Sequence, residues 1–546
     1  MKQLSIVLCG LLAACGGAAE TTKTGAGSGS GSAAATPAGD VSFEVPVIEI
    51  KGVVFEPEAF EPGMPLADKK GLSGEAFEKM KPEQQNKLIE TQRKLAQTTK
   101  DSVLREAQSA ILATMLYRQA KTAAPDAQQK AYTDARDALH DAAQASGKKV
   151  DELTLRLLGS YDLLLKDWPG AEQAWADLVK AAPKSPDLAL NKAAWAYALL
   201  RQYKNADALA VVKDEKLDPK APELAYVAAW AKWRGGDDGG AWQAISIAHR
   251  GWDDRNTQDI IDRDTFIIAA RGKAGVDQVT QQLLVLLAKT PADQYGVLSK
   301  LGLGAYGFAG KWSEGIATLE KALAAGGDKI PENERAGIRF NEAQFEVPLD
   351  APDQAAVYGK QALEALGKCE KCTADDKSNV ALGVYYMGRL FHLIYATSGD
   401  IRYYTPAHDL YQAAIPMLPA GKQADAGNDA GKLETTMKNT RAGKGTHDKD
   451  AIGVLMQRHN AEVQACYELA LVSNPKVGGT VSVSVEADAN GAIKGVTTDP
   501  KAGGDGMPMV AGCVADHVKT WKLPKRMQAG TTRMKLSYSL APRKGA

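Results

Sequence analysis

The sequence predicts a mainly α-helical protein, an α-solenoid of helix pairs followed by a small C-terminal α+β domain. Two observations support this architecture. Small residues recur at a fixed interval through the centre of the chain, as expected where one helix pair stacks on the next. Residues 450–546 then combine two apolar helical faces with three segments of alternating apolar residues. With 546 residues, of which 45% are hydrophobic, the chain is long enough for several packed domains.

The central repeat has a spacing of 35 residues. Each copy carries a small residue and a second residue four positions later: Ala171 and Trp175, Ala206 and Ala210, and Ala241 and Ile245. The first copy resembles the tetratricopeptide (TPR) pattern of paired helices, whose period is about 34 residues. Weaker copies occur at residues 310–323 and 388–419. We therefore expect TPR-like helical repeats over residues 151–419, and an alanine-rich bundle without repeats is the alternative.

The first residues predict a secretory signal peptide over residues 1–14. Lys2 precedes an apolar stretch from Leu4 to Ala14, whose 11 residues fall short of the about 20 that a membrane-spanning helix needs. The run Leu-Ala-Ala-Cys that ends at Cys15 resembles the lipobox of bacterial lipoproteins. This resemblance implies lipid attachment at Cys15, and Gly16 after it favours the outer membrane, facing the periplasm. An ordinary signal peptide with an incidental cysteine is the alternative.

Composition divides much of the remaining chain. Residues 15–42 are rich in Gly, Ser and Ala and predict a flexible lipid tether. Residues 43–150 begin as an extended arm of Val, Ile, Phe and Pro and continue as a helical segment, along which we expect the arm to lie. Residues 420–449 are rich in Gly, Lys, Asp, Asn and Thr. They predict a linker that isolates the C-terminal domain.

The C-terminal domain, residues 450–546, predicts a helix followed by strand, strand, helix and strand. Apolar residues at helical spacing run from Ile452 to Ala470, and valines alternate from Val481 to Val485. The dipeptide Asn490-Gly491 predicts a tight turn into the second strand. A second helical face lies within residues 510–521, and alternation from residue 534 to 540 predicts the last strand.

This domain resembles the TonB C-terminal domain and, more closely, the AgmX/PglI C-terminal domain. The resemblance is carried by Cys466-Tyr467, Asn474-Pro475, Gly479-Thr480-Val481, Asn490-Gly491 with Ile493, Cys513, Trp521, Pro524 and the last strand. It implies partner binding in gliding motility or envelope transport. It does not imply force generation, because TonB transducers carry an N-terminal transmembrane helix where this chain has a lipid signal.

The resemblance also implies that partners add a strand to an open sheet edge at Thr532 to Leu540. The side chains of Lys535, Ser537 and Ser539 would lie opposite the apolar face of this strand, and Thr532 would begin the edge. The alternative is that this segment is a packed structural strand.

The cysteines predict two disulfides in an oxidising compartment. Cys466 and Cys513 each lie on the apolar face of a predicted helix, and a bond between them would contribute about 4 kcal/mol. Two free buried thiols are the alternative. Cys369 and Cys372 form a CxxC without a following His or a second CxxC. We expect a local structural disulfide there, with a redox or metal role as the alternative.

Charge and motifs narrow the function classes. Lys plus Arg and Asp plus Glu both number 66, which does not favour nucleic acid as a partner. No GxSxG, Walker or HExxH signature occurs, and we expect no cofactor and no metal. The sequence therefore predicts a non-catalytic, lipid-anchored adapter that binds other envelope proteins. A thiol-disulfide oxidoreductase using Cys369 and Cys372, and a cell-wall or peptide-binding receptor, are the alternatives.

Overall fold

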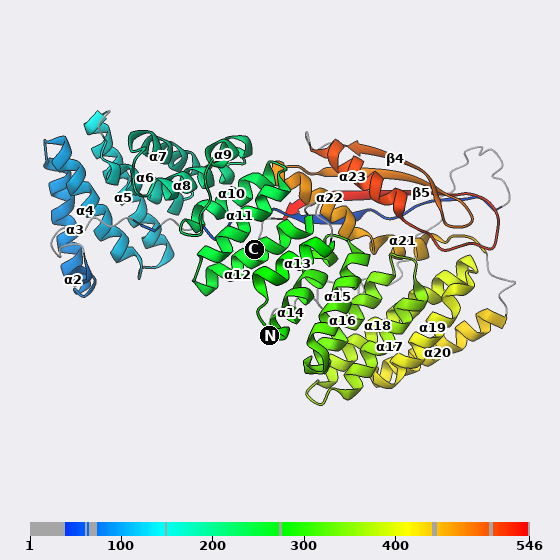
Figure 1. The fold of residues 1–546 in the computed structure, drawn as a ribbon. Coiled ribbons are helices and arrows are strands. Elements are labelled where there is room, and N and C mark those ends of the chain that lie inside the picture. Colours follow the sequence, from blue (N-terminus) through cyan, green and yellow to red (C-terminus); the bar gives the residue numbers. More distant parts are fainter. Residues whose placement is uncertain are drawn as a thin grey trace. The chain divides into compact units, whose positions relative to one another are not determined.

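A computed structural model describes residues 39–60, 63–64, 74–147, 150–271, 276–438, 445–501 and 506–543. The signal peptide, Cys15 and most of the predicted tether lie outside these residues. The chain divides into two compact units, both drawn in Figure 1: Glu56–Ile268, here called the repeat unit, and Met1–Phe55 with Ala269–Ala546, called the sheet unit. Among the described helices none is both long and apolar enough to span a membrane. The predicted fold class, mainly α with a small α+β region, is confirmed.

The repeat unit consists of consecutive helices that pack in antiparallel pairs. It opens with α2 (Glu75–Glu78), α3 (Pro82–Thr98), α4 (Ser102–Ala120) and α5 (Pro125–Ser146). The pairs that follow are α6 (Glu152–Leu164) with α7 (Trp168–Ala181), α8 (Leu188–Arg201) with α9 (Asn205–Val212), and α10 (Pro222–Arg234) with α11 (Asp238–Gly251). Most of α12 (Arg255–Arg271) also belongs to this unit.

The sheet unit continues the helical series and adds the mixed domain. Its helices are α13 (Val276–Leu287), α14 (Pro291–Ser299) with the π-helix η2 (Lys300–Tyr306), α15 (Trp312–Gly326), η3 (Gly327–Lys329), α16 (Glu332–Glu346), α17 (Pro352–Lys368), α18 (Ala374–Ser398), η4 (Ile401–Tyr403), α19 (Tyr404–Ala414), η5 (Ile415–Met417), α20 (Ala420–Lys438), α21 (Lys449–Gln457), α22 (Asn460–Ser473) and α23 (Met507–Thr520). Its strands are β1 (Val41–Glu44), β2 (Ile48–Val53), β3 (Gly479–Ala487), β4 (Ile493–Lys501) and β5 (Thr532–Arg543).

One backbone turn recurs between the two helices of a pair. A residue with positive φ stands two positions before the first residue of the second helix, at Lys166, Tyr203, Gly236, Gly310 and Asp350. This left-handed conformation reverses the chain direction and favours glycine, yet three of these positions carry other residues. The turn is therefore a repeat feature that side-chain spacing does not reveal, and it occurs in both units.

The buried small residue of each second helix lies three positions after the helix begins. Ala171, Ala208 and Ala241 have no exposed surface, and the residues four positions later, Trp175, Val212 and Ile245, are also buried. The predicted 35-residue phase is therefore wrong in the second copy, because Ala206 and Ala210 are exposed. The turn inside each pair keeps its length, but α9 is shorter than α7 and α11 and the connections between pairs differ, so equivalent positions are separated by unequal intervals. The close approach itself is confirmed at Gly159, where a Cβ would lie 2.5 Å from the indole nitrogen of Trp175.

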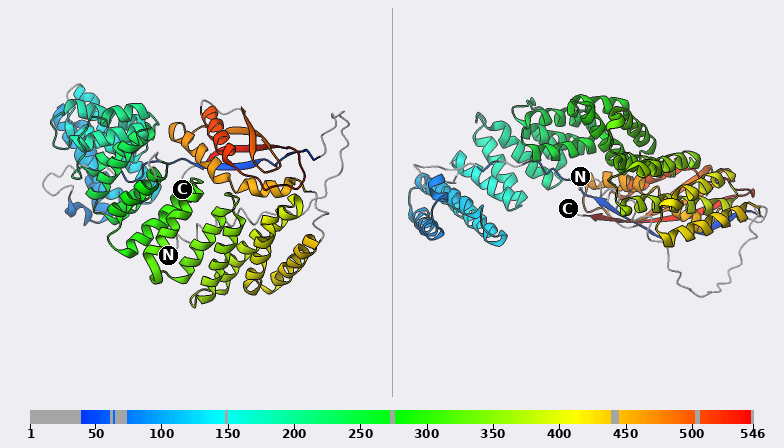
Figure 2. Two further views of the ribbon diagram at one scale, coloured as in Figure 1. Left: turned by 45° about the vertical axis from the view of Figure 1, so that its right-hand side comes forward. Right: turned by 90° about the horizontal axis from the view of Figure 1, so that it is seen from below.

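The C-terminal sheet has the order β1-β5-β3-β4, and β2 continues β1 along the same side of β5. β3 pairs antiparallel with β4 and with β5, whereas β1 and β2 pair parallel with β5. Helix α22 packs on β2, and α23 packs on β3 and β4, so both helices cover one face (Figures 1 and 2). The other face carries polar side chains such as Ser484 and Lys535.

The predicted linker at residues 420–449 contains helix α20, which packs against α18 and α19. Three of its apolar side chains, Ala426, Ala430 and Leu433, recur at helical spacing and are buried. The C-terminal domain is not isolated either, since α21 packs on α18.

Candidate functional site

The strand predicted as an open edge is an interior strand of the sheet. β5 is flanked by β3 on one side, with Val483 opposite Leu536, and by β1 and β2 on the other, with Ile48 opposite Tyr538. The arm thus pairs with the C-terminal sheet, and the prediction that it lies along the following helical segment is wrong for residues 41–53. Almost 500 residues separate the paired strands, so no local pattern in the sequence reveals the pairing.

The four residues predicted along this edge have ordinary structural roles. Thr532 is fully buried, and its hydroxyl lies 2.8 Å from Nδ1 of His447 and accepts from Arg526 at 2.8 Å. Lys535 pairs with Glu44 of the arm at 3.2 Å, and Ser537 lies 3.4 Å from the hydroxyl of Ser482. The side chains of Lys535, Ser537 and Ser539 alternate with the buried apolar residues of β5, as the pattern predicts.

The arm is fixed where it enters the sheet. The Asp40 carboxylate accepts a hydrogen bond from the backbone N–H of Thr531 at 2.7 Å, and the Arg526 guanidinium donates to the Gly39 carbonyl. Gly39 has φ +97°, and a Cβ there would lie 2.0 Å from the Ala529 carbonyl oxygen. Only glycine fits this contact. These residues are not apparent from the sequence, since Gly39 is indistinguishable from the glycines of the tether before it.

The arm is fixed again where it leaves the sheet. The backbone N–H of Val53 donates to the buried carboxylate of Glu468 on α22 at 3.0 Å. At Gly52, a Cβ would lie 2.6 Å from the ring of Tyr467, so this residue lets the strand approach α22 closely. The arm therefore belongs to the folded domain along its whole length from residue 39 to residue 53.

β4 forms one edge of the sheet, and the arm strands β1 and β2 form the other. Within the described chain, β4 pairs with β3 and has no strand on its other side, apart from a bridge between Ala492 and Lys522 just before it begins. This edge carries Lys494, Pro500 and Lys501. Lysine and proline on an edge strand oppose the addition of a further strand. The β4 edge is therefore unsuited to strand addition, and the arm covers the side of β5 that was predicted to be open.

A buried carboxylate joins the helical repeats to the C-terminal domain. Glu462 on α22 accepts hydrogen bonds from the indole N–H of Trp312, on α15, at 2.7 Å and from that of Trp521. It also lies 3.1 Å from Nδ1 of His459, whose ring stacks on Trp521. Burial alone would raise the pKa of Glu462, but the hydrogen bonds from His459 and the two indoles outweigh it and keep that pKa below its usual range.

The predicted continuous helix over residues 452–474 is broken beside this carboxylate. α21 ends at Gln457 and α22 begins at Asn460, which places His459 in the connection and turns it towards Glu462. The sequence does not reveal the break, because apolar residues continue at helical spacing across it.

The C-terminal cysteines form the expected disulfide, Cys466 with Cys513, which connects α22 to α23 with 5.7 Å between their Cα atoms. His517 lies beside this bond, and the two sulfurs and a ring nitrogen of His517 fall within 4.8 Å of one another. A metal would need the thiolates, and the disulfide uses both sulfurs. His517 also lies 3.6 Å from Glu462, and its side chain is partly exposed.

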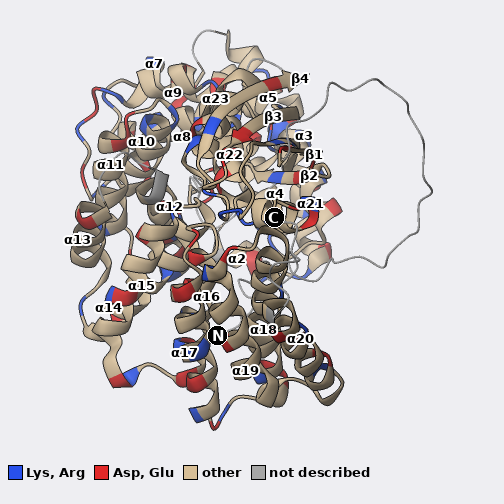
Figure 3. Ribbon diagram, turned by 90° about the vertical axis from the view of Figure 1, so that its right-hand side faces the viewer, with Lys and Arg blue, Asp and Glu red and all other residues tan. Residues whose placement is uncertain are grey.

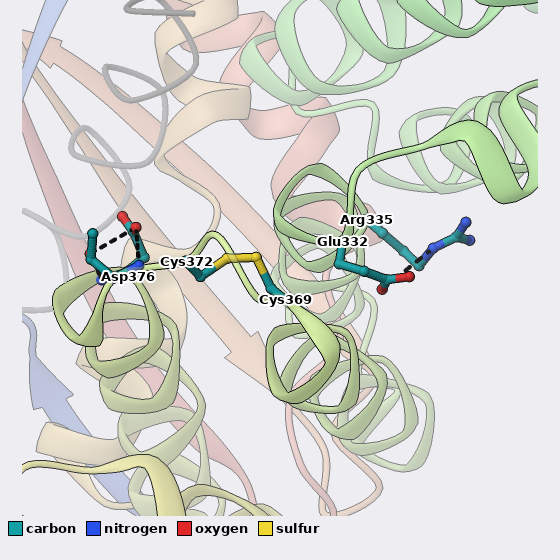
Figure 4. The surroundings of a disulfide bond; sticks show 6 residues. Glu332, Arg335, Cys369, Cys372 and Asp376 are labelled. Carbon is teal, nitrogen blue, oxygen red and sulfur yellow. Dashed lines mark hydrogen bonds and ion pairs between the residues drawn. A yellow bond between two sulfur atoms is a disulfide. The ribbon is translucent and has the colours of Figure 1, made fainter.

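Cys369 and Cys372 form the second expected disulfide, in the connection between α17 and α18 (Figure 4). Cys369 is the C-cap of α17 and is 6% exposed, and Cys372 immediately precedes Thr373, the N-cap of α18. Asp376 completes the capping box with Thr373. The bond therefore joins two helix ends, and its first sulfur has little access to solvent.

Charged residues are mixed over the helices (Figure 3). On α16, for example, Glu332 and Glu334 stand beside Arg335 and Arg339. Arg339 in turn pairs with the buried Glu342 at 2.8 Å. This mixture agrees with the balanced composition of the chain.

Comparisons with known proteins give a distant likeness alone. No family model and no curated protein matches the chain. Among solved structures, one of Naa15/Naa10 bound to HypK-THB is similar at 12% identity and a TM-score of 0.23, covering 72% of this chain and 65% of that one. This chain therefore spans less than two thirds of that protein's length. The helical-repeat architecture described above rests on the helix pairs of this chain itself.

Proposed function

We propose that the protein is a non-catalytic, lipid-anchored scaffold of the cell envelope, which holds other envelope proteins on its helical repeats. The observation that carries the proposal is the series of helix pairs built on one recurrent turn. Stacked pairs present side chains from successive helices on one continuous surface, which suits contact with another protein chain. Gliding motility or envelope transport is the proposed setting.

The proposed anchor depends on the run from Leu12 to Cys15. The arm begins only 24 residues after Cys15, at Gly39, and enters the C-terminal sheet at once. A lipid at Cys15 would therefore hold the C-terminal sheet at the membrane through this short tether. The repeat unit comes next in the chain, from Glu56 onward. The outer membrane, on its periplasmic side, is the proposed location.

The C-terminal domain supports this proposal as a TonB-like module of the AgmX/PglI type. Its order of helices, strand, strand, helix and strand is the order the resemblance implies. The arm pairs along the side of β5 that was predicted to be open, and the β4 edge carries lysines and a proline. We therefore assign partner binding to the helical repeats and give the domain the role of connecting them to the anchor.

Membrane fractionation tests the anchor. The Cys15→Ser protein is expected to remain as an uncut precursor or in the soluble fraction, whereas the wild type sediments with membranes. Equal sedimentation of both would contradict the lipid anchor. Chemical crosslinking in the native organism, followed by mass spectrometry, tests the scaffold itself. Reproducible crosslinks from the repeats to other envelope proteins are expected, and their absence would contradict the proposal.

The alternative thiol-disulfide activity has its own test. Cys372 lies at the start of α18, and a helix N-terminus stabilises a thiolate. An active enzyme would reduce insulin and lose this activity in the Cys372→Ser protein. We expect no insulin reduction by the wild type, because the bond joins the ends of two packed helices and so serves the fold.

A further inference from the structure

An extended stretch of the chain lies across the first helices of successive pairs in the repeat unit. Residues 56–60, Glu-Pro-Glu-Ala-Phe, belong to neither helix nor strand, and Pro57, Ala59 and Phe60 are buried. Their contacts come from α8, α10 and α12 and from the turn after α8. The segment is therefore held as a peptide would be, by side chains of the repeat helices.

The repeats hold the main chain of this segment through one tyrosine. The hydroxyl of Tyr226 on α10 accepts the backbone N–H groups of Glu58 at 2.9 Å and Ala59 at 3.1 Å. The same hydroxyl donates to the fully buried carboxylate of Asp264 at 2.7 Å. A tyrosine hydroxyl has one donor and two acceptor positions, and all are used here. Asp264 thus fixes the orientation in which Tyr226 receives two consecutive N–H groups.

Two arginines match the two carboxylates of the segment. Arg201 on α8 pairs with Glu56 at 2.5 Å, and Arg263 on α12 pairs with Glu58 at 2.8 Å. Arg263 also donates to Asp264, which keeps its guanidinium in place. The face is therefore complementary in charge to an acidic chain.

An aromatic contact ends the segment. Phe60 is 3% exposed, and its ring lies 4.7 Å from that of Tyr197 on α8. The guanidinium of Arg201 stacks over Trp168 with 4.6 Å to the ring centroid, so the aromatic and the charged contacts share one surface. Tyr197, Arg201, Tyr226 and Arg263 together are called the segment-binding face below.

We propose that the segment-binding face is a binding site for an extended acidic segment of a partner protein, two carboxylates flanking one residue and followed by an aromatic, and that residues 56–60 close it in cis. This inference rests on the proposed scaffold function and names the partner chemistry and the regulation of one of its surfaces. The cis segment competes at an effective concentration on the order of millimolar, because it is tethered to the face. A partner binds only where its own segment is held more tightly or the cis segment is released.

Fluorescence anisotropy on the purified full chain tests the proposal. The probe is a labelled peptide of residues 54–61, Val-Phe-Glu-Pro-Glu-Ala-Phe-Glu. The opened protein carries Glu58→Ala and Phe60→Ala, which remove an ion pair and the aromatic contact of the cis segment. Circular dichroism and thermal unfolding show whether it keeps the wild-type fold. The opened protein is expected to bind the peptide at least about tenfold more tightly than the wild type.

Two comparisons test the chemistry of recognition. A peptide with lysine in place of Glu56 and Glu58 is expected to bind the opened protein at least about tenfold more weakly. In a double-mutant cycle, Arg263→Gln should weaken binding of the native peptide about threefold and leave binding of the Glu58→Gln peptide unchanged. A merely structural role of Arg263 would weaken both peptides equally.

Each contrary result overturns a stated part of the proposal. A folded opened protein that fails to bind, or that binds the lysine peptide equally well, excludes an acidic-segment site. Light scattering that shows wild-type dimers lost on opening would identify the occupant as a second copy of this chain and overturn its assignment to another protein. The scaffold function has a separate test in cells, since crosslinks from other repeat surfaces would persist if this face bound nothing.

Discussion

The pairing of the arm with β5 predicts a large difference between two substitutions three residues apart. Ile50 is 3% exposed and packs into the core of the sheet unit, whereas Val47 is 62% exposed in the same arm. Ile50→Ala leaves a cavity between β2 and α22, and such changes cost about 2–5 kcal/mol. Val47→Ala removes little buried surface, and surface changes stay within about 0.5 kcal/mol.

The assay follows local opening as well as global stability. If the arm can leave the sheet without unfolding it, the stability lost in Ile50→Ala appears first as faster hydrogen exchange of the arm and of β5. A cost of 2 kcal/mol corresponds to exchange about 30-fold faster. Mass spectrometry of peptides covering residues 41–53 and 532–543 would therefore report the change, with denaturant unfolding measured in parallel.

Val47→Ala is the matched control for this experiment. Exchange in β5 should remain at the wild-type rate in that variant. Equal exchange in both variants, or faster exchange in the arm with no change in β5, would refute the pairing of these two segments.

Three further predictions concern the repeat unit and are read from its unfolding free energy. Ala208→Trp should cost about 1–3 kcal/mol by overpacking, whereas Ala206→Trp at an exposed site should be near neutral, and equal effects would contradict the corrected repeat phase. Lys166→Gly should stabilise by about 1 kcal/mol by relieving positive φ, and Lys184→Gly, in a turn without it, should not. Burial raises the pKa of Asp162 to about 7, so the folded protein keeps this proton to a higher pH than the unfolded chain does. Wild-type stability should therefore decrease as the pH rises from about 4 to about 7, by at most about 4 kcal/mol. Asp162→Asn should flatten this decrease, and parallel pH profiles of the two proteins would contradict the prediction.

The parts of the fold that local patterns determine could be predicted from the sequence. Alternation from Met534 to Leu540 predicted a strand, and the recurrent small residues predicted closely packed helix pairs, such as the pair in which Gly159 meets Trp175. The phase of the repeat could not be predicted, because it depends on a turn whose residue with positive φ is Lys in one pair and Asp in another. Backbone conformation, and not side-chain type, is what repeats there.

The candidate sites depend on contacts between distant segments, which a single sequence does not reveal. Nothing near Glu56 indicates that it pairs with Arg201, and nothing near Gly39 indicates that Arg526 binds its carbonyl. The alternation of β5 fits an edge strand and an interior strand equally well. The number of its neighbours is a property of the whole chain.

Photocrosslinking in the native organism tests the scaffold claim most directly. A photoreactive residue would replace Val285 on α13, which is 86% exposed, or Val357 on α17, which is 40% exposed; both lie on repeat helices of the sheet unit. A third variant with the photoreactive residue at Lys535, on the polar face of the sheet, is the comparison. The scaffold account predicts that other envelope proteins crosslink to the two repeat positions and that the Lys535 position stays free of them. Crosslinks confined to the Lys535 position would show that the sheet is the binding surface, and would contradict the account.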